Sequence, residues 1–297
     1  MVNRKKKPVK AEKFKRSRAR EEAAKIAAQA IKEKLNIEQV PKVALVLGTG
    51  WGNALKLKES KSVSFKELPG FEGLGDLEGH QRKVVYGFID EAPVIALSGR
   101  VHVNEGIFDR NLINMVRLQV EMLLQLGVHK LILTCAAGGI PTPGSRPSEV
   151  GDIVAIDGFL TVLGNMTPPL EGGEFYSADD VISDELLELA EKNGDQFGLK
   201  VKIGGYCYYR GPNFEGRKYD KRFIALSGVM AVGMSTLPEA LVCALYRDEG
   251  VEILPIAFIT NSSIEEHSHE ENMARAKEKS KNLGNFVSHL ATLVSAM

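Results

Sequence analysis

The sequence predicts an α/β layer fold with a mainly parallel or mixed sheet, and three observations support this. Short apolar runs recur along the chain as buried strands do, and amphipathic helical patterns lie between several of them. The 297 residues, 44% of them hydrophobic, are enough for one large domain with a sizeable core. No apolar run is long enough to cross a membrane, and the N-terminus lacks the apolar stretch of a secretion signal. We therefore expect one cytoplasmic domain.

The first twenty residues differ in composition from the rest of the chain. They hold ten Lys or Arg residues against one acid, Glu12, which leaves 28 basic and 37 acidic residues in the remainder. A segment that repels itself and has little apolar surface does not fold alone. We expect residues 1–20 to form a disordered basic tail and residues 21–297 to form the domain.

The helices and strands follow from the spacing of apolar residues along the chain. Small and aliphatic residues recur at helical spacing over 21–35, which predicts an amphipathic helix. Residues 42–52 predict a buried strand that runs into a glycine-rich turn. The other continuous apolar runs predict strands at 83–89, 93–99, 130–139, 152–156 and 253–261. Helical spacing predicts helices at 108–127, 183–198, 236–250 and, at the end of the chain, about 269–295.

Cysteine usage indicates a reducing compartment. The chain has three cysteines, Cys135, Cys207 and Cys243, and none of them lies in a CxxC pair or a His/Cys cluster. An odd, sparse set of this kind argues against a disulfide framework and against a structural zinc site.

The stretch "SGRVHVNEG" places polar side chains directly after a predicted strand. Arg100, His102 and Asn104 alternate there, and on an extended chain residues two apart share a face. A cation and an imidazole repel each other when both are charged, so an anion bound between them explains the pattern. The alternative is a polar edge strand that faces water.

The glycine-rich turn after the first strand contains Gly48, Thr49, Gly50 and Gly52. It is neither a Walker loop nor a dinucleotide fingerprint, because no Gly-Lys-Ser/Thr follows and the glycine spacing is GxGxG. Glycines required only by a tight turn would explain it. The functional alternative is that backbone N–H groups and the Thr49 hydroxyl face a phosphate.

The stretch "VGMSTLPEA" predicts the start of a helix. Thr236 and Glu239 have the spacing of a capping box, and Pro238 lies in the first turn. Ser235 comes just before this helix, near the positive end of its dipole, where an anion is stabilised. The alternative is that Ser235 and Thr236 serve only as caps.

Three further segments contain groups that suit a flat, polar ligand. In the loop at 210–217 the ring of Phe214 is next to the carboxylate of Glu215, as expected for stacking on a base and accepting its N–H. Asn261 ends an apolar strand with an amide that both donates and accepts. His269 lies near the start of the last predicted helix, where a solvated histidine is the more common case.

These motifs, in this order, resemble the trimeric purine nucleoside phosphorylases from about residue 40 to the C-terminus. "EGHQRK" resembles the family's GHxGx loop, and "GRVHVNEG" resembles GRxHxYEG. "TCAAGGI" is similar to TNAAGG, "GPNFEG" to GPxFET, and "VGMSTLPEA" to VGMSTVPE. The resemblance implies a single-domain, three-layer phosphorylase-type fold whose central mixed, partly barrel-like sheet is flanked by helices. It also implies a homotrimer.

The resemblance implies a pentosyltransferase of purine salvage. The reaction is reversible phosphorolysis of a purine nucleoside to the free base and ribose 1-phosphate, with orthophosphate as co-substrate and no metal or organic cofactor. Asn261 stands where members selective for 6-oxopurines have Asn, so inosine and guanosine are expected over adenosine.

The resemblance also implies a role for each matched residue. The implied phosphate ligands are Thr49, Arg100, His102, the backbone of Ala136, and Ser235. The implied purine contacts are Phe214, Glu215, Val232, Met234 and Asn261, and the implied sugar contacts are Asn104, Met234 and His269. His80 is expected on a mobile loop over the phosphate, and the implied catalytic residues are Asn261, Glu215 and His102.

The chain departs from the family pattern mainly at the implied sugar site. Thr49 replaces a Ser, Asn104 replaces a Tyr that packs on the sugar, and Cys135 replaces an Asn. The segment 158–186 is shorter than in the family. A degenerate phosphorylase, or one with another sugar or a methylthio-nucleoside as substrate, is therefore an alternative. A second alternative is a nucleic-acid-associated or nuclear protein that acts through its basic tail.

Overall fold

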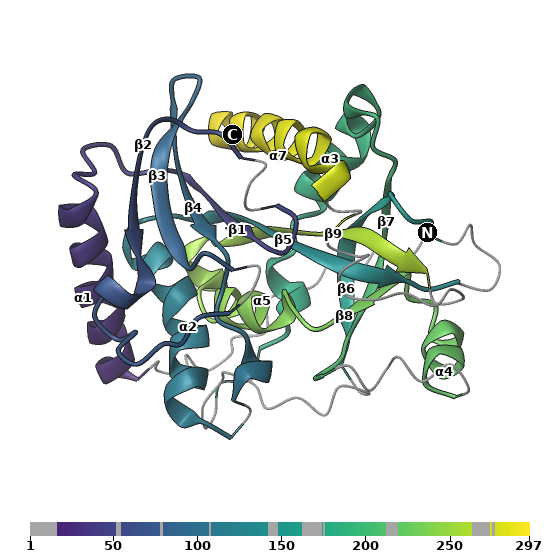
Figure 1. The fold of residues 1–297 in the computed structure, drawn as a ribbon, viewed down its shortest axis with the longest axis horizontal. Helices are drawn as coiled ribbons and strands as arrows, with labels where there is room; N and C mark the ends of the chain where they lie inside the picture. The colour runs from purple at the N-terminus through teal and green to yellow at the C-terminus, as the bar shows by residue number, and fades with distance from the viewer. Residues whose placement is uncertain are drawn as a thin grey trace.

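The computed structural model describes residues 17–51, 55–77, 80–106, 108–141, 148–161, 174, 176–211, 219–262, 274 and 277–297. Within these residues nine strands form one sheet in the order β2-β3-β4-β1-β5-β8-β7-β6-β9, and β9 also pairs with β5. The sheet therefore has an open arm at one end and a closed ring of strands at the other (Figure 1).

The open arm is built around β1 (Val43–Leu47), whose five residues are all apolar and buried. Strand β1 lies parallel to β4 (Ala92–Ser98) on one side and to β5 (Lys130–Gly139) on the other. Beyond β4 come β3 (Lys83–Ile89) and the edge strand β2 (Lys58–Ser64), each antiparallel to its neighbour. Because β4, β1 and β5 are parallel, their carboxyl ends meet at one edge of the sheet, which is where α/β folds bind ligands.

The closed ring contains five strands and shares β5 with the open arm. From β5 it continues through β8 (Ala231–Gly233), β7 (Val201–Tyr208) and β6 (Ile153–Leu160) to β9 (Glu252–Ser262). Strand β9 then lies parallel to β5 over almost its full length, which closes the barrel. The predicted mixed, partly barrel-like sheet is confirmed.

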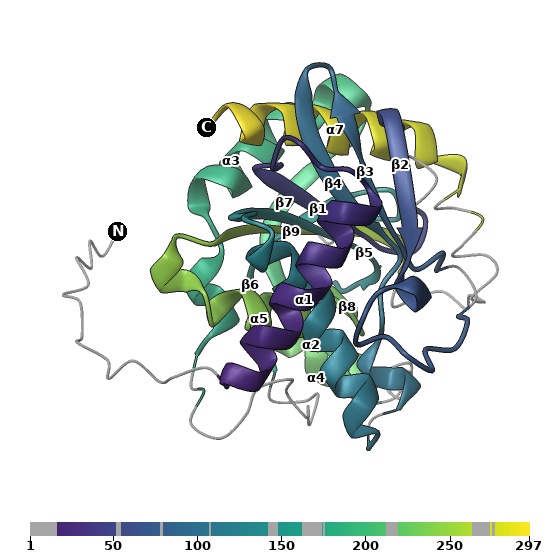
Figure 2. The ribbon, with the colours of Figure 1, turned by 90° about the vertical axis from the view of Figure 1, so that its left-hand side faces the viewer.

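Helices cover both faces of the sheet and make the three layers (Figure 1; Figure 2). On one face α1 (Arg18–Lys34), α2 (Arg110–Gln125) and α5 (Leu237–Ala244) pack in one apolar cluster with the sheet. On the other face α3 (Asp184–Asn193) and α7 (Ser280–Ala296) pack in a second cluster. A further helix, α4, spans Asp220–Leu226. Short 3-10 turns occur at Phe65–Glu67, Val103–Glu105, Ala178–Val181, Asp195–Phe197 and Arg247–Glu249.

The predicted strands and helices are present, with shifted ends at several places, although residues 269–273 and 275–276, at the start of the last predicted helix, lie outside the described residues. The boundary of the basic tail was predicted too late, because α1 already begins at Arg18. The Arg20 guanidinium donates to the Asn114 side chain of α2 over 2.8 Å, which ties the first helical turn to the domain. Residues 1–16 lie outside the described residues. Strands β2, β7 and β8 and helix α4 were not predicted from the sequence.

Two further features concern the predicted absence of membrane-spanning segments and of disulfides. No helix among the described residues is both long enough and apolar enough to span a bilayer. Cys135, Cys207 and Cys243 are all buried free thiols, so none of them forms a disulfide.

Candidate active site

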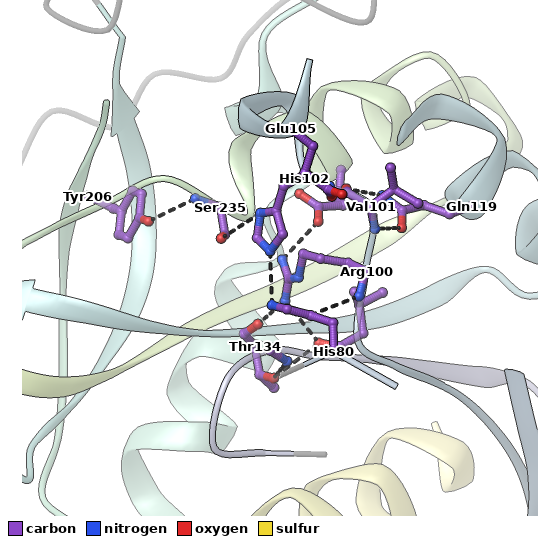
Figure 3. Close-up of polar contacts among 12 residues, drawn as sticks. His80, Arg100, Val101, His102, Glu105, Gln119, Thr134, Tyr206 and Ser235 are labelled. Atoms are coloured by element: carbon purple, nitrogen blue, oxygen red, sulfur yellow. Dashed lines mark hydrogen bonds and ion pairs between the residues drawn. The ribbon is translucent and has the colours of Figure 1, made fainter. Parts of the chain in front are cut away.

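Polar side chains gather where β4, β1 and β5 end, and they come from segments far apart in the sequence (Figure 3). Lys83 at the start of β3 pairs with Ser98 at the end of β4. Because these strands are antiparallel, the residues just before β3 lie beside those just after β4. This register places His80 next to Arg100 and His102.

The Arg100 side chain is buried and already paired with protein groups. It is 1% exposed, and its Nη1 donates to Glu239 Oε1 over 2.8 Å while its Nη2 donates to the Thr134 carbonyl. Gly48 makes room for it, because a Cβ there would lie 3.1 Å from Arg100 Nη2 and 2.6 Å from the Thr134 oxygen. The Arg100 Nε–H has no partner among the described residues. Glu239 neutralises the guanidinium, and the role of Arg100 as a phosphate ligand stays a prediction.

The expected alternation of Arg100, His102 and Asn104 on a strand is also wrong in part. Strand β4 ends at Ser98, and the backbone stays extended only to His102, which has φ −103° and ψ 140°. Residues Val103–Glu105 then form a 3-10 turn, so Asn104 does not continue the alternation. The Asn104 Oδ1 is buried and has no partner among the described residues.

A glutamine side chain makes the backbone hydrogen bonds of Val101 that a neighbouring strand would otherwise make. The Gln119 side chain on α2 accepts from the Val101 N–H over 2.8 Å and donates to the Val101 carbonyl over 3.0 Å. These two bonds hold the extended backbone on which Arg100 and His102 sit. The sequence gives no signal for Gln119, because it lies on a helix that reads as apolar and amphipathic.

His102 contacts two other polar side chains. Its Nε2 lies 3.2 Å from His80 Nε2, and its Nδ1 lies 3.5 Å from the Ser235 hydroxyl (Figure 3). The two imidazole rings meet edge to face, with centroids 4.7 Å apart. Burial lowers the pKa of His102 well below its usual value, and the charge of Arg100 and then His80 and Arg82 lower it further. His102 is therefore a neutral imidazole at neutral pH.

The glycine-rich turn has a structural reason for its glycines. The Trp51 N–H donates to the Gly48 carbonyl over 3.0 Å, and Gly50 takes φ +84°, as a tight turn requires. The Gly48 N–H donates to Thr134 Oγ1 over 3.0 Å. Two N–H groups of the turn are thus used within the protein, and Thr49 is half-buried between them. Gly52 lies outside the described residues.

The segment before α5 carries Ser235 to His102. Gly233 is needed there because a Cβ would overlap the Tyr206 hydroxyl, which accepts from the Ser235 N–H over 3.4 Å. The helix begins where predicted, with Pro238 in its first turn, but the capping box is wrong. Thr236 caps the helix without a side-chain hydrogen bond and takes φ +76°, and Glu239 is turned to Arg100 instead.

A second polar position lies on the barrel side of the same edge. Gly138 of β5 pairs with Asn261 of β9 and with Val232 of β8. A Cβ on Gly138 would lie 3.1 Å from Asn261 Nδ2 and 3.5 Å from the Val232 side chain, so the glycine leaves room for the amide. The Thr260 hydroxyl lies 3.1 Å from Asn261 Oδ1. The Thr260 hydroxyl thus orients the amide, with Oδ1 on the side of Thr260 and Nδ2 on the side of Gly138.

Comparison with known proteins identifies the family. The sequence profile described as the phosphorylase superfamily matches residues 42–292. The chain belongs to the phosphorylase superfamily. It is 34% identical over 242 residues to purine nucleoside phosphorylase 1 of Geobacillus stearothermophilus, covering 79% of this chain and 82% of that protein. It is 30% identical over 272 residues to the purine nucleoside phosphorylase of Bos taurus, covering 85% and 89%.

Solved structures agree on the fold of this phosphorylase. A crystal structure of Schistosoma mansoni purine nucleoside phosphorylase in complex with inosine superposes with a TM-score of 0.78 at 23% identity, covering 91% of this chain and 95% of that one. Isoform 2 from the same organism, in complex with cytosine and ribose 1-phosphate, gives a TM-score of 0.73 at 24% identity. The recognition of the family from its motifs is confirmed.

The structure brings several of the expected phosphorylase site residues to one edge of the sheet and does not describe others. His80, Arg100, His102 and Ser235 form one connected group. The Ala136 carbonyl lies next to Gly233, and the half-buried Met234 packs against the apolar cluster that contains Val232. Phe214, Glu215 and His269 lie outside the described residues.

Glu239, Tyr206 and Thr134 belong to the site and were not expected there. Glu239 could have been found in the "STLPE" motif, but its spacing from Thr236 fits a helix cap equally well. The substituted Cys135 is 1% exposed, and burial raises the pKa of its thiol. It remains protonated and is no nucleophile. Within the described part of the chain no group of three or more His, Cys, Asp or Glu could hold a metal ion.

Proposed function

We propose that this chain is a purine nucleoside phosphorylase, a pentosyltransferase that cleaves 6-oxopurine nucleosides with orthophosphate. One observation carries the proposal. The anion donors His102 and Ser235 and the base-facing amide Asn261 are linked through the short strand β8. Val232 of β8 adjoins Asn261 across Gly138, and Ser235 follows Val232 by three residues and meets His102. In the proposed complex the base of the nucleoside lies at one end of this segment and the phosphate at the other.

Phosphate is held mainly by neutral donors in this proposal. His102 is neutral and Arg100 is paired with Glu239, so the surplus positive charge at the site is small. The Ser235 hydroxyl, a His102 ring N–H and the unpartnered Arg100 Nε–H are the protein donors that remain. Fixed donors of this kind stabilise an oxyanion without any reorganisation during the reaction.

Cleavage of the C1′–N9 bond requires stabilisation of the charge that develops on the sugar and on the purine. A phosphate oxygen attacks C1′ as the C1′–N9 bond breaks, and the bonding electrons leave with the purine. Positive charge that develops on the sugar is stabilised by the phosphate anion, and negative charge develops on the purine. The Asn261 Nδ2–H donates to the purine, and this hydrogen bond strengthens as the charge builds. Glu215, Phe214 and His269 keep the roles that the family resemblance implies for them.

The preference for 6-oxopurines follows from the same amide. A donor at Asn261 Nδ2 matches the acceptors N7 and O6 of inosine and guanosine, whereas the 6-amino group of adenosine is itself a donor. A mismatched, buried polar pair is strongly discriminated against. Inosine and guanosine are therefore the proposed substrates.

The test measures the release of free base by purified protein. Inosine, guanosine, adenosine and xanthosine are each incubated with and without phosphate. The expected result is phosphate-dependent release of hypoxanthine and guanine, with little adenine formed. Base release that is independent of phosphate, or brisk cleavage of adenosine, would contradict the proposal.

A second substrate class is favoured by Asn104. Its buried Oδ1 lacks a partner among the described residues, as expected for an acceptor that waits for a ligand hydroxyl. Sugars other than ribose are therefore included in the same assay, as 2′-deoxyinosine and arabinosylhypoxanthine. A higher kcat/KM for arabinosylhypoxanthine than for inosine that is lost in Asn104→Ala would assign the altered sugar preference to Asn104, whereas 2′-deoxyinosine, which lacks one hydroxyl, tests whether that hydroxyl is needed.

The homotrimer, the cytoplasmic location and the tail are also proposals. The trimer is what the family resemblance implies, and light scattering of the full chain would measure it. For the tail, deletion of residues 1–16 is expected to leave phosphorolysis unchanged. Salt-sensitive binding of the full chain to DNA or RNA that disappears on this deletion would instead support the nucleic-acid alternative.

A further inference from the structure

We propose that His80 is a positioning residue that fixes the tautomer of His102, so that the His102 ring N–H lies on Nδ1 and points at Ser235 and the bound anion. The inference rests on the proposed function and deepens it. In this proposal His80 acts through its hydrogen bond with His102 and does not bind phosphate itself.

The direction of each hydrogen bond follows from one fixed donor. The backbone N–H of Arg100 lies 3.2 Å from His80 Nδ1, and an amide N–H can only donate, so this nitrogen accepts. A neutral His80 then carries its proton on Nε2. That nitrogen lies 3.2 Å from His102 Nε2, which must accept (Figure 3). The His102 proton is left on Nδ1, which faces the Ser235 hydroxyl at 3.5 Å.

The fold holds His80 in this place from two sides. Gly99 takes φ +90°, and a Cβ there would lie 2.9 Å from both Cα and Cβ of His80, so only glycine lets the segments approach. Two residues after His80, the buried Arg82 guanidinium donates to Glu105 Oε2. The other oxygen of Glu105 accepts from the His102 N–H over 2.7 Å. One carboxylate therefore joins the segment of His80 to the segment of His102.

Burial and the nearby positive charges disfavour a proton added to His102. Arg82 lies on the His80 segment and Arg100 lies after β4, and each is paired with one carboxylate, Glu105 and Glu239 respectively. A proton added to His102 would occupy Nε2 and oppose the Nε2–H of His80. Protonation of His102 would therefore break its hydrogen bond with His80. Burial of His102 near Arg82 and Arg100 disfavours that protonation.

The test compares His80→Leu with His80→Gln in the full chain. Leu removes the donor to His102, whereas the Gln amide can still donate from a similar position. We expect His80→Leu to raise the KM for phosphate about ten- to a hundredfold, by analogy with the hydrogen-bond partners that orient metal-binding histidines, with a smaller change in kcat. His80→Gln is expected to recover most of this loss. Equal KM values for wild type and His80→Leu would overturn the proposal.

Nitrogen NMR of 15N-histidine-labelled protein supplies a readout that needs no activity. The chain has six histidines, and the His102 signals are assigned by their loss in His102→Gln. Wild type is expected to show the Nδ1–H tautomer of His102, and His80→Leu a mixture of tautomers. An Nε2–H tautomer in wild type, or an unchanged tautomer in His80→Leu, would contradict the inference. This measurement remains valid even if no nucleoside is cleaved, which separates it from the proposed function.

Two further variants distinguish the loss of the His80 hydrogen bond from a general loosening of the fold. Gly99→Ala displaces His80 without changing its ring, so it is expected to reproduce the tautomer mixture of His80→Leu. His289→Gln is the matched control. His289 lies on α7 and contacts Asn193 of α3, and both helices pack on the face of the sheet opposite α1, α2 and α5. It is expected to leave both the KM for phosphate and the His102 signals unchanged. A tautomer change in His289→Gln would mean that the signal reports general loosening and would overturn the assignment to His80.

Discussion

The two ends of the site, the proposed anion end and the proposed base end, are stabilised in different ways. At the anion end, charged groups are buried and paired before any ligand arrives, as Arg100 is with Glu239 and Arg82 with Glu105. At the base end, Asn261 is placed by strand register across Gly138, and the Thr260 hydroxyl orients its amide. The first end depends on ion pairs within the fold, and the second on the shape of the backbone.

This difference predicts which property each end controls. Removing one partner of a buried ion pair leaves an uncompensated charge in the core, so changes at the anion end act first on folding. A buried amide held by strand register contributes little to stability but meets the reacting ligand directly. Changes at the base end should therefore act on catalysis while the fold stays intact.

The largest effect is expected from Glu239→Ala. This change leaves the Arg100 guanidinium, 1% exposed, without its carboxylate. The free energy of unfolding should fall by about 3–5 kcal/mol, measured by urea denaturation. Glu239→Gln, which keeps an acceptor oxygen, should lose clearly less. A loss below about 1 kcal/mol for the Ala variant would show that the pair contributes no more than a surface salt bridge.

Next in size is the effect of Asn261→Ala on turnover. Loss of one preorganised donor to the departing purine should lower kcat for inosine about a hundred- to a thousandfold. The KM for phosphate and the urea midpoint should stay close to wild type, in contrast to Glu239→Ala. Turnover of inosine at the wild-type rate would remove Asn261 from the proposed mechanism.

A pH dependence of stability distinguishes the anion end further. His102 has a lowered pKa in the folded state, so below about pH 6.5 the unfolded chain binds a proton at this position before the folded chain does. Its contribution to stability therefore falls as the pH drops from about 6.5 towards the folded pKa, by at most about 1.4 kcal/mol per pH unit. His102→Gln should flatten this part of the profile. An unchanged slope between pH 6.5 and 5 would contradict the lowered pKa.

The sequence predicted the parts of the fold whose signal is local. Strand β1 is a run of five buried apolar residues, and the pattern gives its position directly. Strand β2 was missed because five of its seven residues are exposed and polar, and only its pairing with β3 makes it a strand. Strand β8 has three residues, too few to show a period.

The sequence predicted those site residues that lie in short, recognisable motifs. His102 and Ser235 were expected together, and the structure places them together. The partners of Arg100 and His102 were not predicted. Glu239 lies 139 positions from Arg100, and the contact of His80 with His102 depends on the register of β3 against β4. No local pattern carries such information, because tertiary packing determines it.

The smallest predicted effect concerns Thr260→Val, which changes the orientation of Asn261 without removing it. The Thr260 hydroxyl lies 3.1 Å from Asn261 Oδ1 and 3.4 Å from the Ala137 carbonyl. Valine has a similar shape but no hydroxyl, so the amide loses one neutral hydrogen bond of about 1 kcal/mol. That energy corresponds to about a fivefold decrease in kcat for inosine. The preference for inosine over adenosine should narrow as well, because a reversed amide presents Oδ1 to the base.

Two comparisons separate this orienting role from a loss of packing. Thr292→Val on α7 removes a hydroxyl that lies 3.2 Å from the Ser288 carbonyl, far from the site in the fold, and should leave kcat unchanged. In the double variant Thr260→Val/Asn261→Ala the loss should equal that of Asn261→Ala alone, since an amide that is absent cannot be misoriented. Additive losses would show that Thr260 acts through the strand rather than through Asn261. The base end would then depend on core packing as much as on the register across Gly138.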